Sequence, residues 1–369
     1  MPVLDSLFQP FACKSLQVKN RFAMAPMTRY LSPGGVLPAE AAEYYRKRAA
    51  GGIGLVISEG AGLDQPASRS VDTVPLFCGE KSLANWDMVR REVQDAGAAM
   101  VPQLWHIGGA PDYNFPDAEH APLISPSGLI GPNIQGGREM SQADIDETIA
   151  AYVRAAAEAA RLGFDAIELH GAHGYLLDQF FWDATNRRED HYGGPDISDR
   201  TRFAVELVGE IRRAVGPDLA IILRISQWKT AMYGAQVVAD PRELERWLTP
   251  LASAGVDIFH CSERRFWEPA FDGSDLNLAG WSKKVSGKPV ISVGSVGLDR
   301  DLMADFESGC SMPSLKSLEE LAHRFDRGEF DIIAVGRSLL ADPDWLEKVR
   351  TERWVELLPY SVACMAPQY

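Results

Sequence analysis

Three polar rings follow one apolar stretch of the sequence at close spacing. The run FDAIELH, residues 164–170, is rich enough in Ile and Leu to be a buried strand, and His170, His173 and Tyr175 lie at its end and just beyond it. Barrel and open α/β enzymes place their chemistry at the carboxyl ends of such strands. Histidine and tyrosine suit a carbonyl reaction, because a neutral imidazole donates hydrogen bonds and a phenol can give up a proton.

Two other interpretations of these histidines are weaker. A metal site would need further ligands, and the sequence offers no HExxH motif and no obvious carboxylate as a third ligand. A structural role in the core would suit either histidine alone, but it explains less well a pair that is followed by Tyr175 after a break at Gly171. We therefore expect no metal and keep His170, His173 and Tyr175 as candidate catalytic residues.

The last two predicted strands end in glycine-containing turns that suit a phosphate group. KPVISVG and FDIIAVG are followed by Ser295 and Arg337, so Gly294 and Gly336 would let the backbone come close to a ligand. Backbone amides and one guanidinium supply the donors that a phosphate needs, and this position is common for phosphates in barrels. The alternative is a pair of tight turns next to an arginine. A phosphate site alone would also fit aldolases and isomerases.

Two further strand ends suit a flat heteroaromatic ligand. The Gln103 amide can donate and accept at once, which matches an amide–imide edge. Arg224 ends an otherwise apolar run, and a buried guanidinium is costly unless it meets negative charge. A flavin whose pyrimidine edge becomes anionic on reduction would supply that charge. A buried structural salt bridge is the alternative for Arg224.

The elements that would position these residues alternate along the whole chain. Apolar strands are predicted at 21–26, 53–60, 98–106, 164–170, 219–226, 256–262, 288–294 and 330–336, and helices at 38–52, 81–97, 141–163, 198–215, 240–254, 275–285, 315–328 and 337–350. Eight strand–helix units without a linker predict one α/β domain over 1–369, a single (β/α)8 TIM barrel. An open doubly wound sheet is the second choice, since no GxGxxG follows the first strand.

Three segments fall outside these units. Residues 4–18 are expected to form an N-terminal lid or hairpin, 107–140 a long loop between a strand and its helix, and 351–369 a C-terminal tail. Among the helices, Ser141 or Asp144 is the expected cap of 141–163, and Asp240 followed by proline is a strong start signal.

Composition and charge limit the class of protein. The 369 residues are 46% hydrophobic and 24% charged, as in ordinary globular proteins. A net charge of −14 argues against nucleic acid as a partner, and no apolar run approaches the length of a membrane span. The five cysteines form no CxxC pair and the N-terminus carries no signal-peptide pattern, so we expect a reduced, cytoplasmic protein without an iron–sulfur cluster.

These residues occur in motifs that resemble the Old Yellow Enzyme family, the flavin-dependent ene-reductases, over almost the whole chain. The matching pieces are, in order, NRFAMAPMTRY, ISEG, QLWH, ELHGAHGYLLDQF, NRRED-YGG, ILRIS, VGS and AVGRSLLADPDW. HGAHGYLLDQF is the most specific of them. The resemblance implies an FMN-bound (β/α)8 barrel that takes hydride from NADPH or NADH and passes it to an activated alkene, such as an enone, enal, maleimide or nitroalkene.

The resemblance also implies a role for each matching position. The expected cofactor-binding residues are Pro26, Met27, Thr28, Gly60, Gln103, His170, Arg224, Gly294, Ser295, Gly336 and Arg337. The expected substrate-binding residues are Tyr30, Trp105, His170, His173 and Tyr175. Of the last three, the two histidines would bind the activating oxygen of the substrate, and Tyr175 would donate the proton.

The chain combines features of two branches of the family. Its HxxH pair resembles the bacterial branch often called thermophilic-like, but that branch carries cysteine where this chain has Thr28. Two other functions stay open: a flavin enzyme of the same fold that oxidises or demethylates a small amine, and a non-redox barrel that binds a phosphorylated ligand. We expect a small-molecule substrate and neither a nucleic-acid nor a membrane partner. The sequence leaves open the natural substrate, the choice between NADH and NADPH, and whether the protein forms a homo-oligomer.

Overall fold

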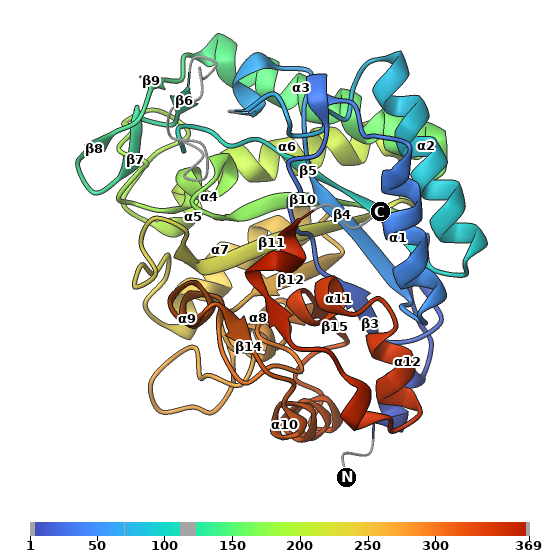
Figure 1. Ribbon diagram of the computed structural model, residues 1–369. Coiled ribbons are helices and arrows are strands. Elements are labelled where there is room, and N and C mark those ends of the chain that lie inside the picture. Colours follow the sequence, from blue (N-terminus) through green and yellow to red (C-terminus); the bar gives the residue numbers. More distant parts are fainter. Residues whose placement is uncertain (1–3, 70, 111–122, 367–369) are drawn as a thin grey trace.

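Eight parallel strands close into a barrel in the computed structural model, which describes residues 4–69, 71–110 and 123–366 (Figure 1). The strands are β3 (Phe22–Met24), β4 (Leu55–Gly62), β5 (Ala99–Trp105), β10 (Ala166–His173), β11 (Ala220–Lys229), β12 (Ile258–Ser262), β13 (Val290–Val293) and β15 (Ile332–Val335). Their order around the barrel follows the chain, and β15 pairs with β3 to close it. The predicted (β/α)8 barrel is therefore confirmed.

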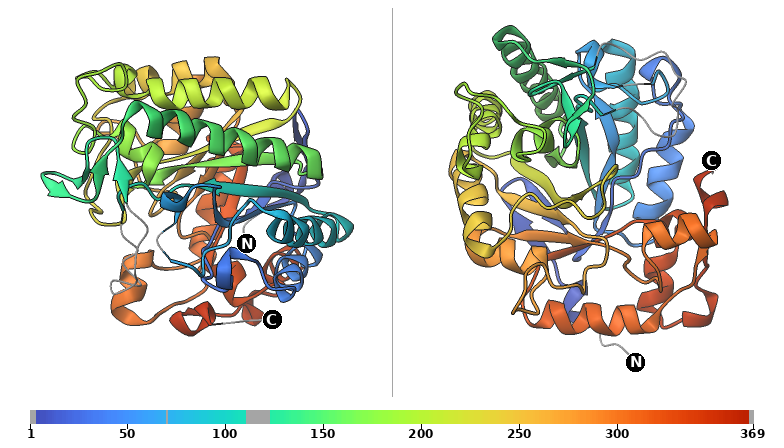
Figure 2. Two further views of the ribbon diagram at one scale, coloured as in Figure 1. Left: turned by 90° about the horizontal axis from the view of Figure 1, so that it is seen from above. Right: turned by 90° about the vertical axis from the view of Figure 1, so that its left-hand side faces the viewer.

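Helices surround the barrel on the outside, as the two further views show (Figure 2). They are α1 (Glu40–Ala50), α2 (Glu80–Asp95), α3 (Gln142–Leu162), α6 (Arg202–Val215), α7 (Pro241–Ala254), α8 (Leu278–Ser286), α10 (Leu315–Asp326), α11 (Arg337–Ala341) and α12 (Trp345–Arg350). Ser141 and Asp144 together form a capping box on α3, and Asp240 caps α7.

Two predicted helices are divided in the structure. The helix expected over 198–215 is two helices, a short α5 (Ile197–Arg200) and α6, separated by Thr201, which itself keeps helical dihedral angles. The helix expected over 337–350 is two helices, α11 and α12. The chain leaves the helical conformation at Asp342 because Pro343 follows it, and a residue before proline avoids that conformation.

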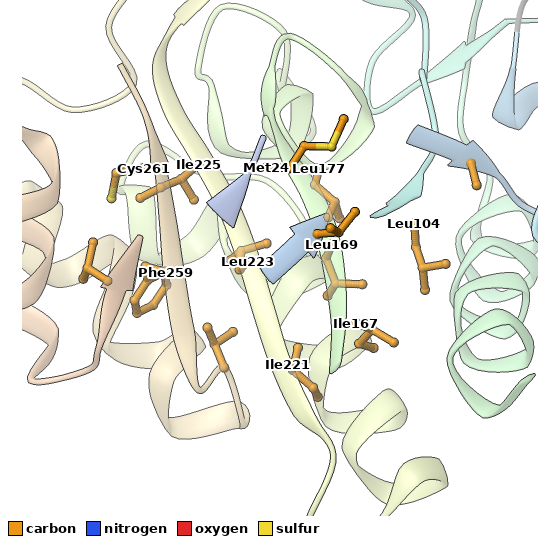
Figure 3. Packing of buried hydrophobic residues seen from close by; sticks show 14 of the residues in the cluster. Met24, Leu104, Ile167, Leu169, Leu177, Ile221, Leu223, Ile225, Phe259 and Cys261 are labelled. Carbon is orange, nitrogen blue, oxygen red and sulfur yellow. The ribbon is translucent and has the colours of Figure 1, made fainter. Parts of the chain in front are cut away.

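The barrel strands are buried on both faces, which explains their continuous apolar runs. The outward side chains pack under the helices, and Figure 3 shows part of this cluster, including Met24, Leu104, Ile167, Leu223 and Phe259. The inward side chains at the amino ends of the strands are small or apolar, namely Ala23, Leu55, Ala99, Ala166, Ala220, Ile258, Ile291 and Ile332. In β5, β10, β11 and β12, steps of two along the strand lead from these positions to the polar Gln103, His170, Arg224 and Ser262 near the carboxyl ends.

The N-terminal segment closes the other end of the barrel. After a 3-10 turn, Asp5–Phe8, the strands β1 (Phe11–Cys13) and β2 (Leu16–Val18) form a hairpin. Leu16 and Val18 pack against the inward alanines and leucine at the amino ends of the strands. The segment expected to be a lid or hairpin is thus a hairpin that seals the end opposite the strand termini where chemistry was expected.

Two segments outside the repeating units add structure above the barrel. In the long loop after β5, the described part from residue 123 forms two small pairs of strands, β6 (Ile124–Ser125) with β9 (Arg138–Glu139) and β7 (Leu129–Gly131) with β8 (Ile134–Gln135). Residues 111–122 of that expected loop lie outside the described ranges. The predicted tail contains a short strand as well, β16 (Tyr360–Ser361), which pairs with β14 (Cys310–Ser311). None of the described helices is long and apolar enough to cross a membrane.

Candidate active site

A cavity of about 680 Å³ opens at the carboxyl ends of the barrel strands. Nearly all of the predicted site residues line it: Pro26, Met27, Thr28, Tyr30, Gln103, Trp105, His170, His173, Tyr175, Arg224, Gly294, Ser295, Gly336 and Arg337. Gly60 does not, because it lies within β4 rather than at its end, behind Trp105. A Cβ atom at Gly60 would come within 2.8 Å of the Trp105 ring and 3.3 Å of Gln103 Oε1, so a side chain there would displace residues that do line the cavity.

The backbone at the end of β10 differs from the prediction and explains how three rings converge. The strand does not break at Gly171 but continues to His173, with an irregular register between them. His173 has a φ of 66°, and its N–H donates to Ser226 Oγ at 2.9 Å. The His170 ring lies 5.1 Å from that of His173 and 5.0 Å from that of Tyr175, centre to centre, with both partners nearly perpendicular to it.

Both histidines are neutral. Burial is the main cause that lowers the pKa of His170 and of His173 well below the usual value, and the nearby Arg224 cation lowers both further. The N–H of Ala172 donates to His170 Nδ1 at 3.3 Å. The proton of this neutral ring is therefore on Nε2, which makes Nε2 a hydrogen-bond donor.

His173 belongs to an aromatic wall that the sequence did not predict. Its ring stacks on Trp228 at 4.3 Å, and Trp228 stacks on Tyr233 at 5.0 Å. His173 Nε2 lies 2.8 Å from Ser262 Oγ, so one of its two nitrogens already has a protein partner. A ligand would have to use Nδ1 or displace the Ser262 hydroxyl, whereas His170 offers its Nε2 proton directly.

A buried ion pair supports the turn that carries His173 and Tyr175. Lys229 Nζ donates to Asp178 Oδ1 at 2.8 Å and lies 2.7 Å from Oδ2, and the two side chains are 2% and 0% exposed. Asp178 also accepts the N–H of Gly174 at 2.6 Å. Burial raises the pKa of Asp178 and lowers that of Lys229, and their mutual attraction opposes both shifts.

Ser295, in the turn after β13, and Arg337, after β15, lie together as predicted. The carboxylate of Asp305, which was not predicted, joins them. Arg337 Nη2 donates to Ser295 Oγ at 3.0 Å, and Nη1 forms an ion pair with the buried Asp305 of α9 (Leu302–Ser308). A Cβ atom at Gly294 would lie 2.6 Å from a backbone carbonyl, so only glycine fits this close approach. Arg337 is therefore held in place by the protein itself.

Known proteins are similar to this chain over most of its length. The model of the NADH:flavin oxidoreductase / NADH oxidase family matches residues 6–309. The chain is 31% identical to an NADH oxidase of Thermoanaerobacter brockii over 97% of its length, but spans only 52% of that relative. It is 30% identical to 12-oxophytodienoate reductase 7 of Oryza sativa subsp. japonica, with 93% of this chain and 87% of the relative covered.

The chain belongs to the NADH:flavin oxidoreductase / NADH oxidase family. A solved structure of an Old Yellow Enzyme homologue from Zymomonas mobilis has the same fold, with a TM-score of 0.78 at 24% identity over 99% of this chain and 97% of that one. The family model and the similarity to 12-oxophytodienoate reductase 7 confirm the predicted membership of the Old Yellow Enzyme family. They also confirm the predicted class of enzyme, an NAD(P)H-dependent flavin oxidoreductase that uses FMN.

The described side chains fit FMN. Arg224 is 7% exposed, its Nε has no hydrogen-bond partner in the described part of the chain, and its Nη2 meets only Ser262 Oγ at 3.3 Å. The structural salt bridge considered for Arg224 is not found among the described residues, and a buried guanidinium without a direct ion pair can take an acceptor from a ligand. In an Old Yellow Enzyme barrel, Gln103 and Arg224 would hold the pyrimidine edge of the flavin, and Ser295 and Arg337 its phosphate.

Several lining residues were missed from the sequence. The cavity is also bordered by Trp228, Thr230, Tyr233, Glu263 and Arg264 and by the tail residues Tyr360, Val362 and Met365. Trp228 could have been found, because it lies in the same strand as Arg224 and near its carboxyl end. No local pattern marks the tail residues, which reach the cavity through the pairing of β16 with β14.

Proposed function

We propose that the chain is an FMN-dependent ene-reductase that takes reducing equivalents from NADPH or NADH and reduces an activated alkene. The observation that carries the proposal is the convergence of His170, His173 and Tyr175 on one cavity beside Gln103 and Arg224. When bound, FMN supplies the hydride for the β-carbon of the alkene. Enones, enals, maleimides and nitroalkenes are the substrate class, because each carries an oxygen that can accept hydrogen bonds.

The protein residues act on the activating oxygen and on the proton. His170 donates from Nε2 to the carbonyl or nitro oxygen, and His173 adds a second donor. Such preorganised donors stabilise negative charge as it develops on that oxygen, which is commonly the largest catalytic contribution. Tyr175 holds the proton for the α-carbon, and a phenol is protonated at neutral pH without special tuning.

One spectrum and one titration test this function. The purified protein should absorb as a flavoprotein with one FMN per chain, and an enone added to the anaerobically reduced protein should restore the oxidised spectrum. A colourless protein that takes up no flavin on reconstitution would favour a non-redox phosphate-binding barrel. Oxygen uptake with a small amine, together with no reaction with enones, would favour oxidation or demethylation of amines.

Arg337→Ala is expected to weaken FMN binding by about tenfold to a hundredfold, because a hydrogen bond to a charged group contributes about 1.5–3 kcal/mol. Fluorescence titration of the flavin-free protein measures this. The variant also leaves Asp305 buried without its cation. The double variant Arg337→Ala/Asp305→Ala should therefore recover thermal stability but not FMN affinity. Unchanged affinity in the single variant would contradict the phosphate site.

Para-substituted phenols are expected to bind above the flavin and give a long-wavelength charge-transfer band, since a phenolate resembles an enolate between two donors. Because Ser262 already occupies His173 Nε2, His170→Ala should weaken phenol binding more than His173→Ala does. Absorbance titration gives each Kd. A band that survives in the double histidine variant would show that the histidines do not face the substrate.

A further inference from the structure

A buried carboxylate lies directly beneath the cavity, and none of the expected roles uses it. Glu168 is 0% exposed and precedes His170 by two residues on the inward face of β10. Gln103 Nε2 donates to Glu168 Oε1 at 2.7 Å, and His260 Nδ1 contacts Glu168 Oε2 at 2.6 Å. Together with Arg224, these side chains form a polar layer (Gln103, Glu168, Arg224 and His260) across the inside of the barrel.

Glu168 determines which way the Gln103 amide faces. Because Gln103 Nε2 donates to Glu168 Oε1, the amide nitrogen points to Glu168 and Gln103 Oε1 points away from it. The amide therefore presents an acceptor to a ligand in the cavity. The surroundings of Gly60 on β4 agree with this orientation of the amide, because Gln103 Oε1 lies 3.3 Å from the position of a Cβ atom at Gly60.

The carboxylate of Glu168 is contacted from two sides, by Gln103 and by His260. Burial lowers the pKa of His260, so its ring is neutral and its Nδ1–H donates to the carboxylate, while its Nε2 has no hydrogen-bond partner among the described residues. Arg224 is the cation of the layer. Burial lowers its pKa, and the attraction of Glu168 opposes that shift, although the two groups form no direct ion pair in the described structure.

We propose that Glu168 is a positioning residue that sets the reduction potential of the bound flavin, by orienting Gln103 and by offsetting the positive charge of Arg224. This proposal rests on the proposed function, in which FMN lies against Gln103 and Arg224. NAD(P)H gives two electrons and one proton to the ring as a hydride and leaves as NAD(P)+, so the ring gains negative charge. A carboxylate beneath the pyrimidine edge opposes that gain and lowers the potential, whereas Arg224 alone would raise it.

Glu168→Gln tests the proposal, because it keeps the shape and removes the charge. The affinity for reduced FMN relative to oxidised FMN should increase by about tenfold, which is a rise in potential of about 30 mV for a two-electron couple. The potential is measured by equilibration with a reference dye. His260→Gln keeps both the charge and a donor to Glu168. In this variant the affinity for reduced FMN relative to oxidised FMN should therefore change by less than about threefold.

Asp257→Asn is the matched control for removing a buried carboxylate from the barrel. Asp257 is 5% exposed and pairs with Lys14 and Arg212 just before the amino end of β12, outside the polar layer. This variant should lose stability without a shift in potential. An equal shift in Asp257→Asn and Glu168→Gln, or no shift in Glu168→Gln, would overturn the proposal.

Two outcomes need to be kept apart. If the unaltered protein binds no flavin, the proposed function is contradicted, and that result does not bear on the role of Glu168. If Glu168→Gln does not fold, Glu168→Met combined with His260→Leu removes the charge and its donor together, a kind of replacement that buried ionic groups commonly tolerate. The same rise in potential is expected in that double variant, and its absence would overturn the proposal equally.

Discussion

Tyr175→Phe is expected to slow the reaction of the reduced enzyme with an enone such as cyclohexenone by about 10²–10⁴-fold, the usual contribution of a positioned acid. Its reduction by NAD(P)H should stay nearly unchanged, because that half-reaction does not use the phenolic proton. The Tyr175 ring packs edge-on against Trp105 at 4.9 Å and His170 at 5.0 Å, and phenylalanine keeps those contacts. Stopped-flow absorbance measures the two half-reactions separately.

Nitroalkenes provide the internal control for Tyr175. Their reduced product is a stable nitronate that water can protonate later, so Tyr175→Phe should slow them much less than enones. Equal losses in both half-reactions would mean that Tyr175 is structural. An unaffected enone reaction would mean that another group, or water, supplies the proton.

Lys229→Met is expected to lower the free energy of unfolding by about 3–5 kcal/mol, because it leaves the Asp178 carboxylate buried without its cation. Urea denaturation of the flavin-free protein measures this change without a contribution from ligand binding. The double variant Lys229→Met/Asp178→Leu should recover much of the loss, since both charges are then absent.

An exposed ion pair on the same protein serves as the comparison for Lys229. Arg213 and Glu210 form an ion pair on α6 with side chains 72% and 38% exposed, so Arg213→Gln should cost less than about 1 kcal/mol. A loss below about 1 kcal/mol in Lys229→Met would show that Asp178 does not depend on this cation. Phenol binding should weaken in Lys229→Met as well, because Asp178 also holds the Gly174 N–H between His173 and Tyr175.

The parts of the molecule that could be predicted are those with local signals. Continuous apolar runs separated by helical spacing predicted the barrel, and glycines after the last strands predicted where Ser295 and Arg337 would meet. Since parallel strands bring their carboxyl ends to one rim, knowing the strand ends was enough to gather His170, Gln103 and Arg224 around one cavity.

The missed parts depend on pairs that are far apart in the sequence. Glu168 lies 65 residues from Gln103 and 92 from His260, and nothing near any of them shows that they share a layer. The expected end of β10 was wrong for a different reason. Gly171 suggested a break, but the bend occurs at His173, a residue whose type does not favour a positive φ.

Three residues other than glycine adopt a positive φ on the cavity wall: Tyr30 at 57°, His173 at 66° and Ser295 at 55°. Such conformations cost on the order of 1–3 kcal/mol each, and glycine would relieve the cost. A library of variants selected only for heat resistance would therefore be drawn toward glycine at all three positions. Such variants would gain stability but would lose the Tyr30 side chain from the cavity wall, the proposed substrate ligand His173 and the Ser295 hydroxyl that contacts Arg337. Directed evolution of this chain therefore needs a screen for turnover in every round.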